Sequence, residues 1–551
     1  EASASKTVSS EALETETSLP NFRQGDAIIL YERNRDTDNV TNKMVFKGNI
    51  EYLTENEIGI RLRATQQNPS VLPAESLYAI EHDTMDTTFR SMYQGLYIYL
   101  SARKERRDLL LSQRPPRFDE SLDSMISRSE DDFTRIALKA KAAQDYFLLI
   151  GPPGTGKTSC ALKKMVETFH ADKDAQILLL SYTNRAVDEI CKSLASIAPA
   201  VDFIRVGSEL SCDEAYRGHL IENELSSCNR RSEVYERIRN CRIIVGTVAA
   251  ISGKPELFRL KHFDVAIIDE ATQILEPQLL GILCARGEDG KDAIDKFVLI
   301  GDHKQLPAVV QQNTEQSAIY DESLLSIGLT NLKDSLFERL YRNCTATVHR
   351  SYDMLCRQGR MHPEVALFAN RAFYGGRLIP VGLPHQIESS DTICRLAFYP
   401  SVPEKAGASA KINYSEARIV ADLAARIYED HQTDFDESRT LGIITPYRSQ
   451  IALIKKEIES LGIPALNRIL VDTVERFQGS ERDVIIYSFC VNYPYQLKFL
   501  SNLTEEEGVL IDRKLNVALT RARKQMFITG VPELLERNPL YKSLLKLIES
   551  F

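Results

Sequence analysis

The stretch that decides the fold of this chain is a glycine-rich loop, Gly151-Pro152-Pro153-Gly154-Thr155-Gly156-Lys157-Thr158-Ser159. It matches the pattern GxxxxGK[ST], with an apolar run before it and an amphipathic segment after it. Its glycines let backbone N–H groups wrap phosphates, and the N-terminus of the following helix adds positive potential. The pattern gives Lys157 to the β and γ phosphates and the Thr158 hydroxyl to Mg²⁺. The loop therefore predicts a nucleoside triphosphate site at the end of a parallel strand.

Apolar runs typical of buried parallel strands recur on both sides of this loop, with amphipathic segments between them. The first series lies at 147–150, 177–182, 241–248, 265–271 and 296–302. The second series lies at 441–447, 469–474, 483–490 and 526–530. We therefore predict an α/β chain with two doubly wound units in tandem, over 121–330 and 331–551. A polar, Glu/Arg-rich helical insertion is expected at about 205–240.

The residues before the first unit follow other patterns. Residues 1–20 are rich in Ser, Thr and Glu, and we expect a disordered tail or linker there. Short apolar alternations over 21–85 predict a small β-barrel or sandwich. Aromatic and Leu positions at helical spacing predict a helical stalk over 86–120.

The composition excludes several classes of protein. In 551 residues, no run approaches 18 apolar residues and the first twenty have no apolar core, so neither a membrane span nor a secretory signal is expected. The 10 Cys contain no CxxC pair, so no disulfide framework or zinc site is indicated. We expect reduced thiols and an intracellular location, cytoplasmic in a prokaryote or nuclear in a eukaryote. Since the chain begins at Glu1, we also expect a missing N-terminal segment.

Polar side chains end two further predicted strands. Asp269 is placed to hold Mg²⁺ through its water shell, and Glu270 to orient and deprotonate the attacking water. Such a pair is common at strand ends, but beside a phosphate loop it indicates hydrolysis. Gln305, in GDHKQLP at 301–307, is placed to sense a γ-phosphate. Its neighbours His303 and Lys304 are predicted to be solvated loop residues.

Two arginines of the second unit are candidates for contact with the γ-phosphate across a cleft. Arg360 lies in RQGRMHP and Arg521 in LNVALTRAR. An arginine finger is worth roughly 10³ to 10⁵ in rate. Apolar residues at core spacing around Arg521 would fix the direction of its guanidinium group. Either arginine, taken alone, also fits an ordinary surface position.

In this order and spacing the segments resemble the superfamily 1 helicases of the up-frameshift type. The segments that carry the resemblance are GPPGTGKT, YTNRAVDEI, DEATQxxEP, GDxxQLP, SLFERL, RMHP, ITPYRSQ, ERFQGSERDVII and LNVALTRAR. The resemblance implies two RecA-like domains with ATP and Mg²⁺ between them, and an N-terminal β-barrel on a helical stalk. The barrel's place and the Gln-Asp-Tyr at 144–146 look more like the replication helicase–nuclease branch, whose upstream nuclease would fit a missing N-terminal segment.

The resemblance also assigns roles to individual residues. It gives Glu481 to the ribose and places Gln478 near the nucleotide cleft. It puts five residues on the backbone of a single strand, which they would hold without reading sequence: Thr183, Asn184, Thr247, Thr445 and Thr473. Ordinary strand propensity remains an alternative explanation for each Thr. A channel lined by donors is locally positive even though the net charge of the chain is −9.

Two departures from the family pattern concern adenine. The family has a Gln about twenty residues before the phosphate loop, and neither Gln113 nor Gln144 fits that place. Gly359 stands where the family has a Tyr that packs on the base. These departures argue against tight adenine selectivity and leave the phosphate chemistry unchanged.

We therefore expect a monomeric, ATP-dependent 5′→3′ helicase or translocase on single-stranded DNA, the polarity being implied by the resemblance. Cleft closure on each cycle would move two strand-gripping surfaces past each other. An RNA helicase with the same motor remains open, as does an ATP-gated clamp or remodeller that does not unwind. A small-molecule P-loop kinase is disfavoured because it has no use for a second unit with two arginines.

Overall fold

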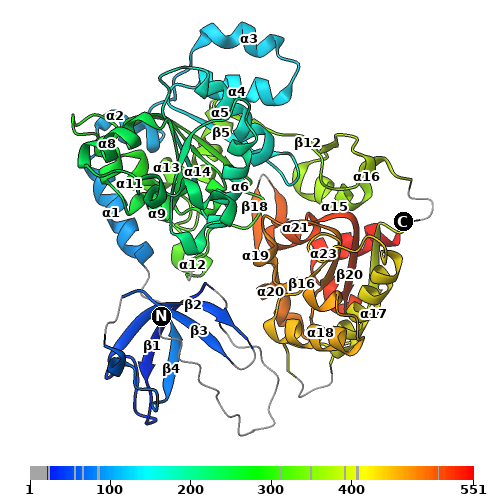
Figure 1. Ribbon diagram of the computed structural model, residues 1–551. Helices are drawn as coiled ribbons and strands as arrows, with labels where there is room; N and C mark the ends of the chain where they lie inside the picture. The colour runs from blue at the N-terminus through cyan, green and yellow to red at the C-terminus, as the bar shows by residue number, and fades with distance from the viewer. Residues whose placement is uncertain are drawn as a thin grey trace. The chain divides into compact units, whose positions relative to one another are not determined.

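The computed structural model describes residues 22, 25–54, 57–64, 68–83, 87–310, 312–347, 350–389, 393–404, 409–506 and 508–550. It forms two compact units, 1–90 and 91–551, which are taken separately below (Figure 1). The tail expected at 1–20 lies outside the described residues. None of the helices in the described ranges is long and apolar enough to cross a membrane.

The first unit contains an antiparallel sheet of four described strands in the order β3-β2-β1-β4. Its strands are β1 (Ala27–Glu32), β2 (Val45–Leu53), β3 (Ile58–Leu62) and β4 (Tyr78–His82). Central β1 pairs with both β2 and β4, and Ile28, Tyr31 and Ile50 are buried. The strands fall in the segment where a β-rich module is predicted. Closure of this sheet into a barrel stays a prediction.

Two helices occupy the segment predicted as a stalk: α1 (Thr87–Ser101) and α2 (Lys104–Leu110). In the second unit, α1 lies against α11 (Glu276–Leu283). A Cβ on Gly95 would lie 2.2 Å from the carbonyl oxygen of Pro277, so this contact requires glycine. Leu109 and Leu110 of α2 are buried in the core of the sheet described next.

That sheet is parallel, with seven strands among the described residues, in the order β11-β5-β10-β9-β6-β8-β7. The strands are β5 (Tyr146–Ile150), β6 (Ile177–Ser181), β7 (Phe203–Val206), β8 (Ile243–Thr247), β9 (Phe263–Ile268), β10 (Ile294–Gly301) and β11 (Tyr352–Met354). Phe147 and Leu149 pack into one core and Leu148 and Ile150 into another, because helices cover both faces. The covering helices include α4 (Asp132–Ala142), α5 (Lys163–His170), α6 (Asn184–Ala195), α9 (Val248–Ser252) and α14 (Leu336–Thr347).

The first α/β domain extends further along the chain than predicted. Strand β11 pairs with β5, and Leu336, Phe337 and Leu340 of α14 are buried in the first domain's core. The boundary expected at 330 therefore lies after Met354, and the SLFERL segment belongs to the first domain. The helical insertion expected from 205 starts later than predicted, because Phe203–Val206 is a strand of the sheet. Helices α7 (Ile221–Glu224) and α8 (Arg231–Asn240) follow it.

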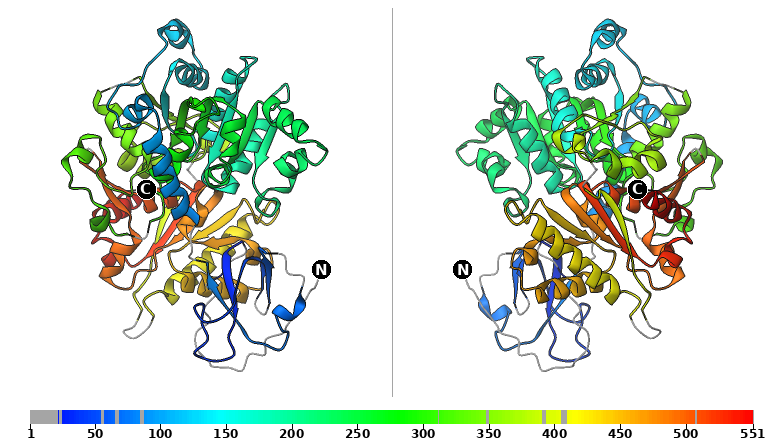
Figure 2. Two further views of the ribbon diagram at one scale, coloured as in Figure 1. Left: turned by 90° about the vertical axis from the view of Figure 1, so that its left-hand side faces the viewer. Right: turned by 90° about the vertical axis from the view of Figure 1, so that its right-hand side faces the viewer.

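The second α/β domain has a parallel sheet with five described strands in the order β14-β20-β17-β15-β16. They are β14 (Leu396–Pro400), β15 (Leu441–Ile444), β16 (Leu470–Asp472), β17 (Arg482–Ser488) and β20 (Ala522–Gly530). Val484 and Ile486 face one core, whereas Ile485 and Tyr487 face the other, under helices on both sides (Figure 2). The helices include α15 (Pro363–Tyr374), α17 (Tyr414–Asp430), α18 (Arg448–Ser460), α19 (Val474–Phe477), α21 (Arg513–Leu519) and α23 (Pro539–Glu549).

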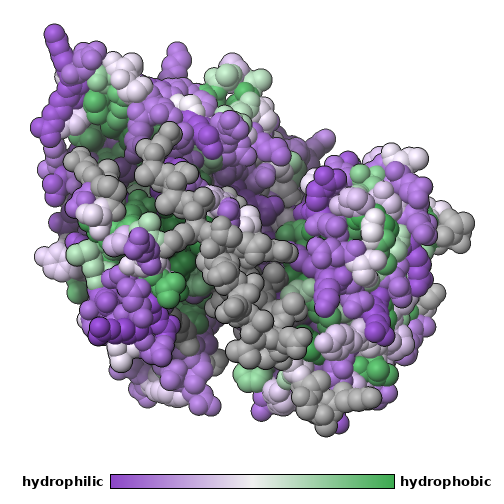
Figure 3. All heavy atoms as spheres, turned by 60° about the horizontal axis from the view of Figure 1, so that its bottom comes forward, coloured by the Kyte–Doolittle hydropathy of each residue, from purple (hydrophilic) through white to green (hydrophobic). Residues whose placement is uncertain are grey.

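The two parallel sheets confirm the predicted α/β class and the tandem arrangement of two doubly wound domains. A short antiparallel hairpin, β18 (Leu503–Glu506) and β19 (Val509–Asp512), precedes α21 in the second domain. Most of the face shown in Figure 3 is hydrophilic, as expected for a chain with 26% charged residues. The carboxyl ends of the first sheet carry the site described next.

Candidate nucleotide site and nucleic-acid interface

The phosphate loop joins the end of β5 to the helical turn η3 (Lys157–Leu162), which continues as α5. Gly154 and Gly156 have φ angles of 74° and 76°, in the left-handed region that favours glycine. A Cβ on Gly151 would lie 2.0 Å from Cγ of Lys157, so the lysine folds back over the start of the loop. The loop therefore has the shape and the donors that a polyphosphate needs.

Two carboxylates at the end of β9 face this loop. The Thr158 hydroxyl donates to Asp269 Oδ2 at 2.5 Å, and Lys157 Nζ lies 3.1 Å from Glu270 Oε1. Glu270 has a φ of 53°, and Gln273 Nε2 donates to its Oε2 at 2.9 Å. The strained backbone and this amide fix the direction of the Glu270 carboxylate.

The charges of these groups depend on one another. Burial raises the pKa of Asp269 to about 6, and the charge of Glu270 adds to the rise. Burial alone would lower the pKa of Lys157, but the charges of Glu270, Asp269 and Asp302 outweigh it and leave the pKa raised. Burial would raise the pKa of Glu270, but the charge of Lys157 outweighs it and the net shift is downward. Glu270 is therefore an ionised carboxylate at neutral pH.

The loop after β10 brings Gln305 to the second domain. Gln305 Nε2 donates to Asp302 Oδ2 at 2.7 Å, and its Oε1 accepts from Arg521 Nη2 at 3.2 Å. Tyr374 also donates to Asp302 Oδ2, at 2.7 Å. Asn516 Nδ2 lies 2.8 Å from the Tyr374 hydroxyl. These buried hydrogen bonds connect the two domains at the nucleotide site.

Arg521 comes from the turn between α21 and β20 and is 2% exposed. Its Nε donates to the carbonyl of Val517 at 3.0 Å, which directs the guanidinium toward Gln305. Burial lowers the pKa of Arg521 to about 9, and the charge of Arg360 adds to the fall. The group is therefore still protonated at neutral pH.

Arg360 reaches the same site by its backbone and its side chain. The Gly359 N–H donates to the carbonyl of Gly154 at 2.8 Å, and a Cβ on Gly154 would lie 2.4 Å from Cβ of Arg360. Arg360 Nε donates to Glu481 Oε2 at 2.6 Å. Burial would raise the pKa of Glu481, but the charge and hydrogen bond of Arg360 outweigh it and the pKa is lowered. The structure thus brings Arg360, Arg521 and Glu481 to the edge of the phosphate loop.

The residues assigned to a single strand follow strands of the two sheets. Thr183 caps α6 and accepts from the Ala186 N–H at 3.2 Å. Thr247 caps α9 in the same way, with 3.1 Å to the Ala250 N–H. Asn184 begins α6, and Thr473 stands just before α19. Thr445 is fully buried, so its hydroxyl does not reach the surface in this arrangement.

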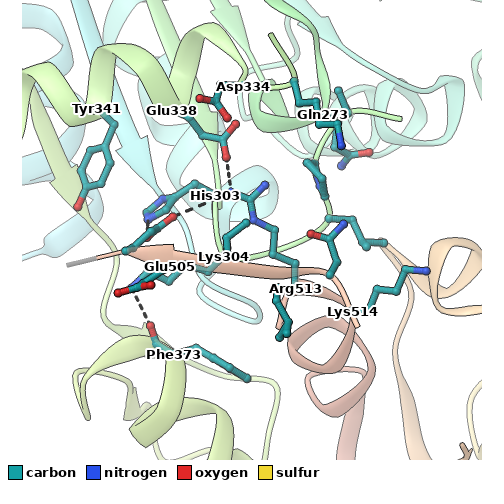
Figure 4. A pocket seen from close by; sticks show the side chains of 18 of the residues that line it. Gln273, His303, Lys304, Asp334, Glu338, Tyr341, Phe373, Glu505, Arg513 and Lys514 are labelled. Atoms are coloured by element: carbon teal, nitrogen blue, oxygen red, sulfur yellow. Dashed lines mark hydrogen bonds and ion pairs between the residues drawn. The ribbon is translucent and has the colours of Figure 1, made fainter. Parts of the chain in front are cut away.

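A cavity of about 1490 Å³ opens between the two domains beside His303 and Lys304 (Figure 4). Thr183 and Gln478 line it, together with hairpin β18–β19. Eight cationic side chains line the cavity: Lys304, Lys333, Arg342, Arg371, Arg377, Lys498, Arg513 and Lys514. Five acidic side chains line it: Asp334, Glu338, Glu475, Glu505 and Glu506. The lining is therefore net positive in a chain whose net charge is −9.

Two family models, both described as "AAA domain", match this chain over 128–234 with 221–313 and over 332–533. A "DNA replication ATP-dependent helicase/nuclease DNA2" of Bos taurus is 27% identical over 97% of this chain and 50% of that protein. The matches support the resemblance of this chain to the superfamily 1 helicases of the up-frameshift type. Another relative, "DNA replication ATP-dependent helicase/nuclease JHS1" of Arabidopsis thaliana, is 28% identical over 96% of this chain and 38% of that protein.

A third relative of this helicase family is the "DNA polymerase alpha-associated DNA helicase A" of Saccharomyces cerevisiae. It is 24% identical over 83% of this chain and 73% of that protein. The chain spans about half the length of the helicase/nucleases it matches. The matched family models begin at residue 128, in α3 (Asp123–Arg128), and so cover both parallel sheets.

The structure corrects one expectation about the loop GDHKQLP. His303 and Lys304 are predicted to be solvated, but His303 is only 4% exposed. Its Nε2 lies 3.1 Å from Glu506 Oε2, and Lys304 Nζ donates to the carbonyl of Phe373 at 2.7 Å. Two ionisable residues in a loop carry no sequence signal of burial, because their partners lie far along the chain.

Proposed function

We propose that this chain is an ATP-driven motor that moves along single-stranded DNA and separates paired strands. The observation that carries the proposal is the meeting of Lys157, Glu270 and Gln305 of one domain with Arg521 of the other, beside a cavity with a positive lining. The relatives support DNA as the polymer, because three of them are named as DNA helicases. The 5′→3′ polarity belongs to the proposal through the family resemblance.

The site fits ATP with Mg²⁺. The hydroxyl of Thr158 and the carboxylate of Asp269 meet at 2.5 Å, and both are the hard oxygen ligands that Mg²⁺ prefers. Lys157 and the loop N–H groups would bind the phosphates, and Glu481 the ribose. When bound, ATP with Mg²⁺ supplies the phosphoanhydride bond whose hydrolysis releases the free energy for movement.

The chain's own residues divide the work of hydrolysis. The ionised Glu270 is the group that orients water and accepts its proton at a carboxylate oxygen. Arg521 and Arg360 stabilise the negative charge that develops at the γ-phosphate. Since both arginines are supplied from beyond the first sheet, the site is complete only when the two domains are together. Closing and opening would then shift the strand-binding surfaces relative to each other.

The first test is steady-state ATP hydrolysis without polymer, with single-stranded DNA and with single-stranded RNA. We expect DNA to stimulate ATP hydrolysis strongly, and we expect Glu270→Gln to show no DNA-stimulated hydrolysis. Stimulation by RNA alone would move the assignment to an RNA helicase. Absence of stimulation by either polymer would contradict the motor function for this chain.

A second experiment separates a helicase from an ATP-gated clamp. Displacement of a labelled strand is measured on duplexes with a 5′ or a 3′ single-stranded overhang. We expect displacement on the 5′ overhang alone. Retention of DNA with ATP but no displacement on either duplex would favour the clamp, and displacement on the 3′ overhang would reverse the polarity.

A further inference from the structure

The loop after β10 lies between the nucleotide site and the cavity. Its Gln305 faces Arg521, whereas His303, two residues earlier, faces the hairpin β18–β19 of the second domain. The His303 side chain is 5% exposed and its ring lies 4.8 Å from the ring of Tyr341, between centroids. One short loop therefore connects the contact of His303 with Glu506 at the cavity wall to a side chain of the nucleotide site.

The hairpin forms part of the cavity wall. Leu503, Thr504 and Val509 line the cavity, while Glu506 extends to His303. Directly after the hairpin, Arg513 Nη2 lies 2.5 Å from Glu338 Oε1 of α14. The hairpin thus contacts the first domain at His303, and the start of α21 is joined to the same domain by the ion pair of Arg513 with Glu338.

We propose that His303 and Glu506 are positioning residues that couple occupancy of this cavity by a nucleic-acid strand to the nucleotide site. This inference rests on the proposed function. Each partner comes from a different domain, so the pair exists only when the two walls of the cavity are together. A strand that contacts both walls binds this arrangement better and raises its population. The same arrangement holds Gln305 Oε1 at 3.2 Å from Arg521 Nη2.

The burial of this connection distinguishes it from an ordinary surface pair. Exposed ion pairs contribute little because water and salt screen them. Glu338 and Arg513 are each 8% exposed at the side chain, and at the other contact the His303 side chain is 5% exposed while that of Glu506 is 31% exposed. When a buried pair loses one partner, the remaining group is left uncompensated. The arrangement with the two cavity walls together and the arrangement with them apart therefore differ in free energy. Such a difference is what coupling between two sites requires.

The experiment compares Glu506→Gln with Glu536→Gln, which removes the same charge from an exposed position of the second domain outside the cavity lining. ATP hydrolysis is titrated with oligo(dT), and the Kd for oligo(dT) is measured separately by fluorescence anisotropy. We expect Glu506→Gln to lower the stimulation factor at saturating oligo(dT) by about 5-fold or more. Its Kd should stay within about 2-fold of the unmodified chain, and Glu536→Gln should match the unmodified chain in both measurements.

The outcomes separate this inference from the proposed function. If the unmodified chain is not stimulated by DNA, the proposed function itself fails. If it is stimulated and Glu506→Gln is stimulated equally, or loses stimulation only through a weaker Kd, the coupling role is wrong. Amide hydrogen exchange is measured on the unmodified chain, so this test does not depend on whether a variant folds. With oligo(dT) bound, residues 302–305 and 503–512 should gain protection together, and protection of the hairpin alone would overturn the proposal.

Discussion

The two parallel sheets present their functional residues in different ways. In the first sheet, the phosphate loop, Asp269 and Gln305 follow β5, β9 and β10, and Thr183 and Thr247 follow the neighbouring β6 and β8. All of them therefore lie at the carboxyl edge of one sheet. At that edge, the residues assigned to the nucleotide lie beside the residues assigned to the nucleic-acid strand.

In the second sheet the two sets of residues lie at opposite edges. Glu481 and Arg521 precede β17 and β20, at the amino ends of these strands. Thr445 and Thr473 follow β15 and β16, at the carboxyl ends. A rigid sheet that turns about an axis between its edges moves both sets at once. In the proposed motor, the first domain would hold both sites in place while the second domain connects them.

The largest effect is expected from the second domain's arginine. Arg521→Ala should lower kcat for ATP hydrolysis by about 10³-fold or more, because it removes the cation that faces Gln305. ATP binding should change much less, since Lys157 and the loop remain. Single-turnover hydrolysis and ATP binding measure the two effects. The exposed Arg537→Ala is the matched control, and an unchanged kcat in Arg521→Ala would place the catalytic cation elsewhere.

The first domain's carboxylate should give the next largest effect. Glu270→Gln keeps the size of the side chain but removes the base, and we expect kcat to fall by roughly 10² to 10⁴. ATP should still bind, and the two domains should still close. The exposed Glu256→Gln serves as the control in the same domain. If both variants hydrolyse ATP equally well, Glu270 does not activate water.

A buried carboxylate of the second sheet should make stability depend on pH. Glu416 Oε2 accepts from the Ser488 hydroxyl at 2.6 Å and from the Cys490 N–H at 2.8 Å. Burial raises the pKa of Glu416 to about 7 from an ordinary 4.5. Because the folded state favours the protonated form, this contribution is complete below pH 4.5 and is lost as the pH rises through 7.

Glu416→Gln stays neutral and should avoid that loss. Between pH 5 and pH 8, we expect the free energy of unfolding of the unmodified chain to fall more than that of Glu416→Gln. The difference between the two falls should be up to about 3 kcal/mol. Urea unfolding at the two pH values measures the difference. Glu429→Gln, exposed on the same helix α17, should show no such change. If the free energies of unfolding of all three proteins change in parallel with pH, Glu416 is ionised at both pH values.

The smallest effect is expected from single cations of the cavity. Arg371→Gln should weaken binding of oligo(dT) equally for all sequences, and reduce the slope of log Kd against log salt by about 0.7. The exposed Arg426→Gln lies on α17 and should leave the slope unchanged. Identical slopes for the two variants would show that the strand does not lie along Arg371.

The sequence predicts the fold wherever a strand is long and apolar. The runs at β5, β6, β8, β9 and β10 are all found as strands, because both faces of these strands are covered. The strand β11 is missed because Tyr352-Asp353-Met354 lies half-buried at the sheet edge and contains a charged residue. That omission also displaces the predicted domain boundary, since only pairing with β5 assigns these residues to the first sheet.

The sequence predicts the part of the candidate site whose residues stand at a characteristic spacing along the chain. Lys157, Thr158, Asp269 and Glu270 stand in patterns whose geometry is local to strand ends, and the structure brings them together. The pair of His303 with Glu506 joins positions about two hundred residues apart, so no local pattern announces it. The burial of Thr445 likewise depends on tertiary packing, which a single sequence does not reveal.

The close approach of Gly154 to residues 359–360 has a mechanical consequence. The segment that leaves the first domain after β11 is tied to the phosphate loop by a backbone hydrogen bond of 2.8 Å, from Gly359 N–H to the Gly154 carbonyl. A change in the shape of the loop is therefore passed to the covalent hinge between the domains without any side chain as intermediary. Such a hinge tolerates variation in the side chains around it, but it leaves no room at position 154 for a residue larger than glycine.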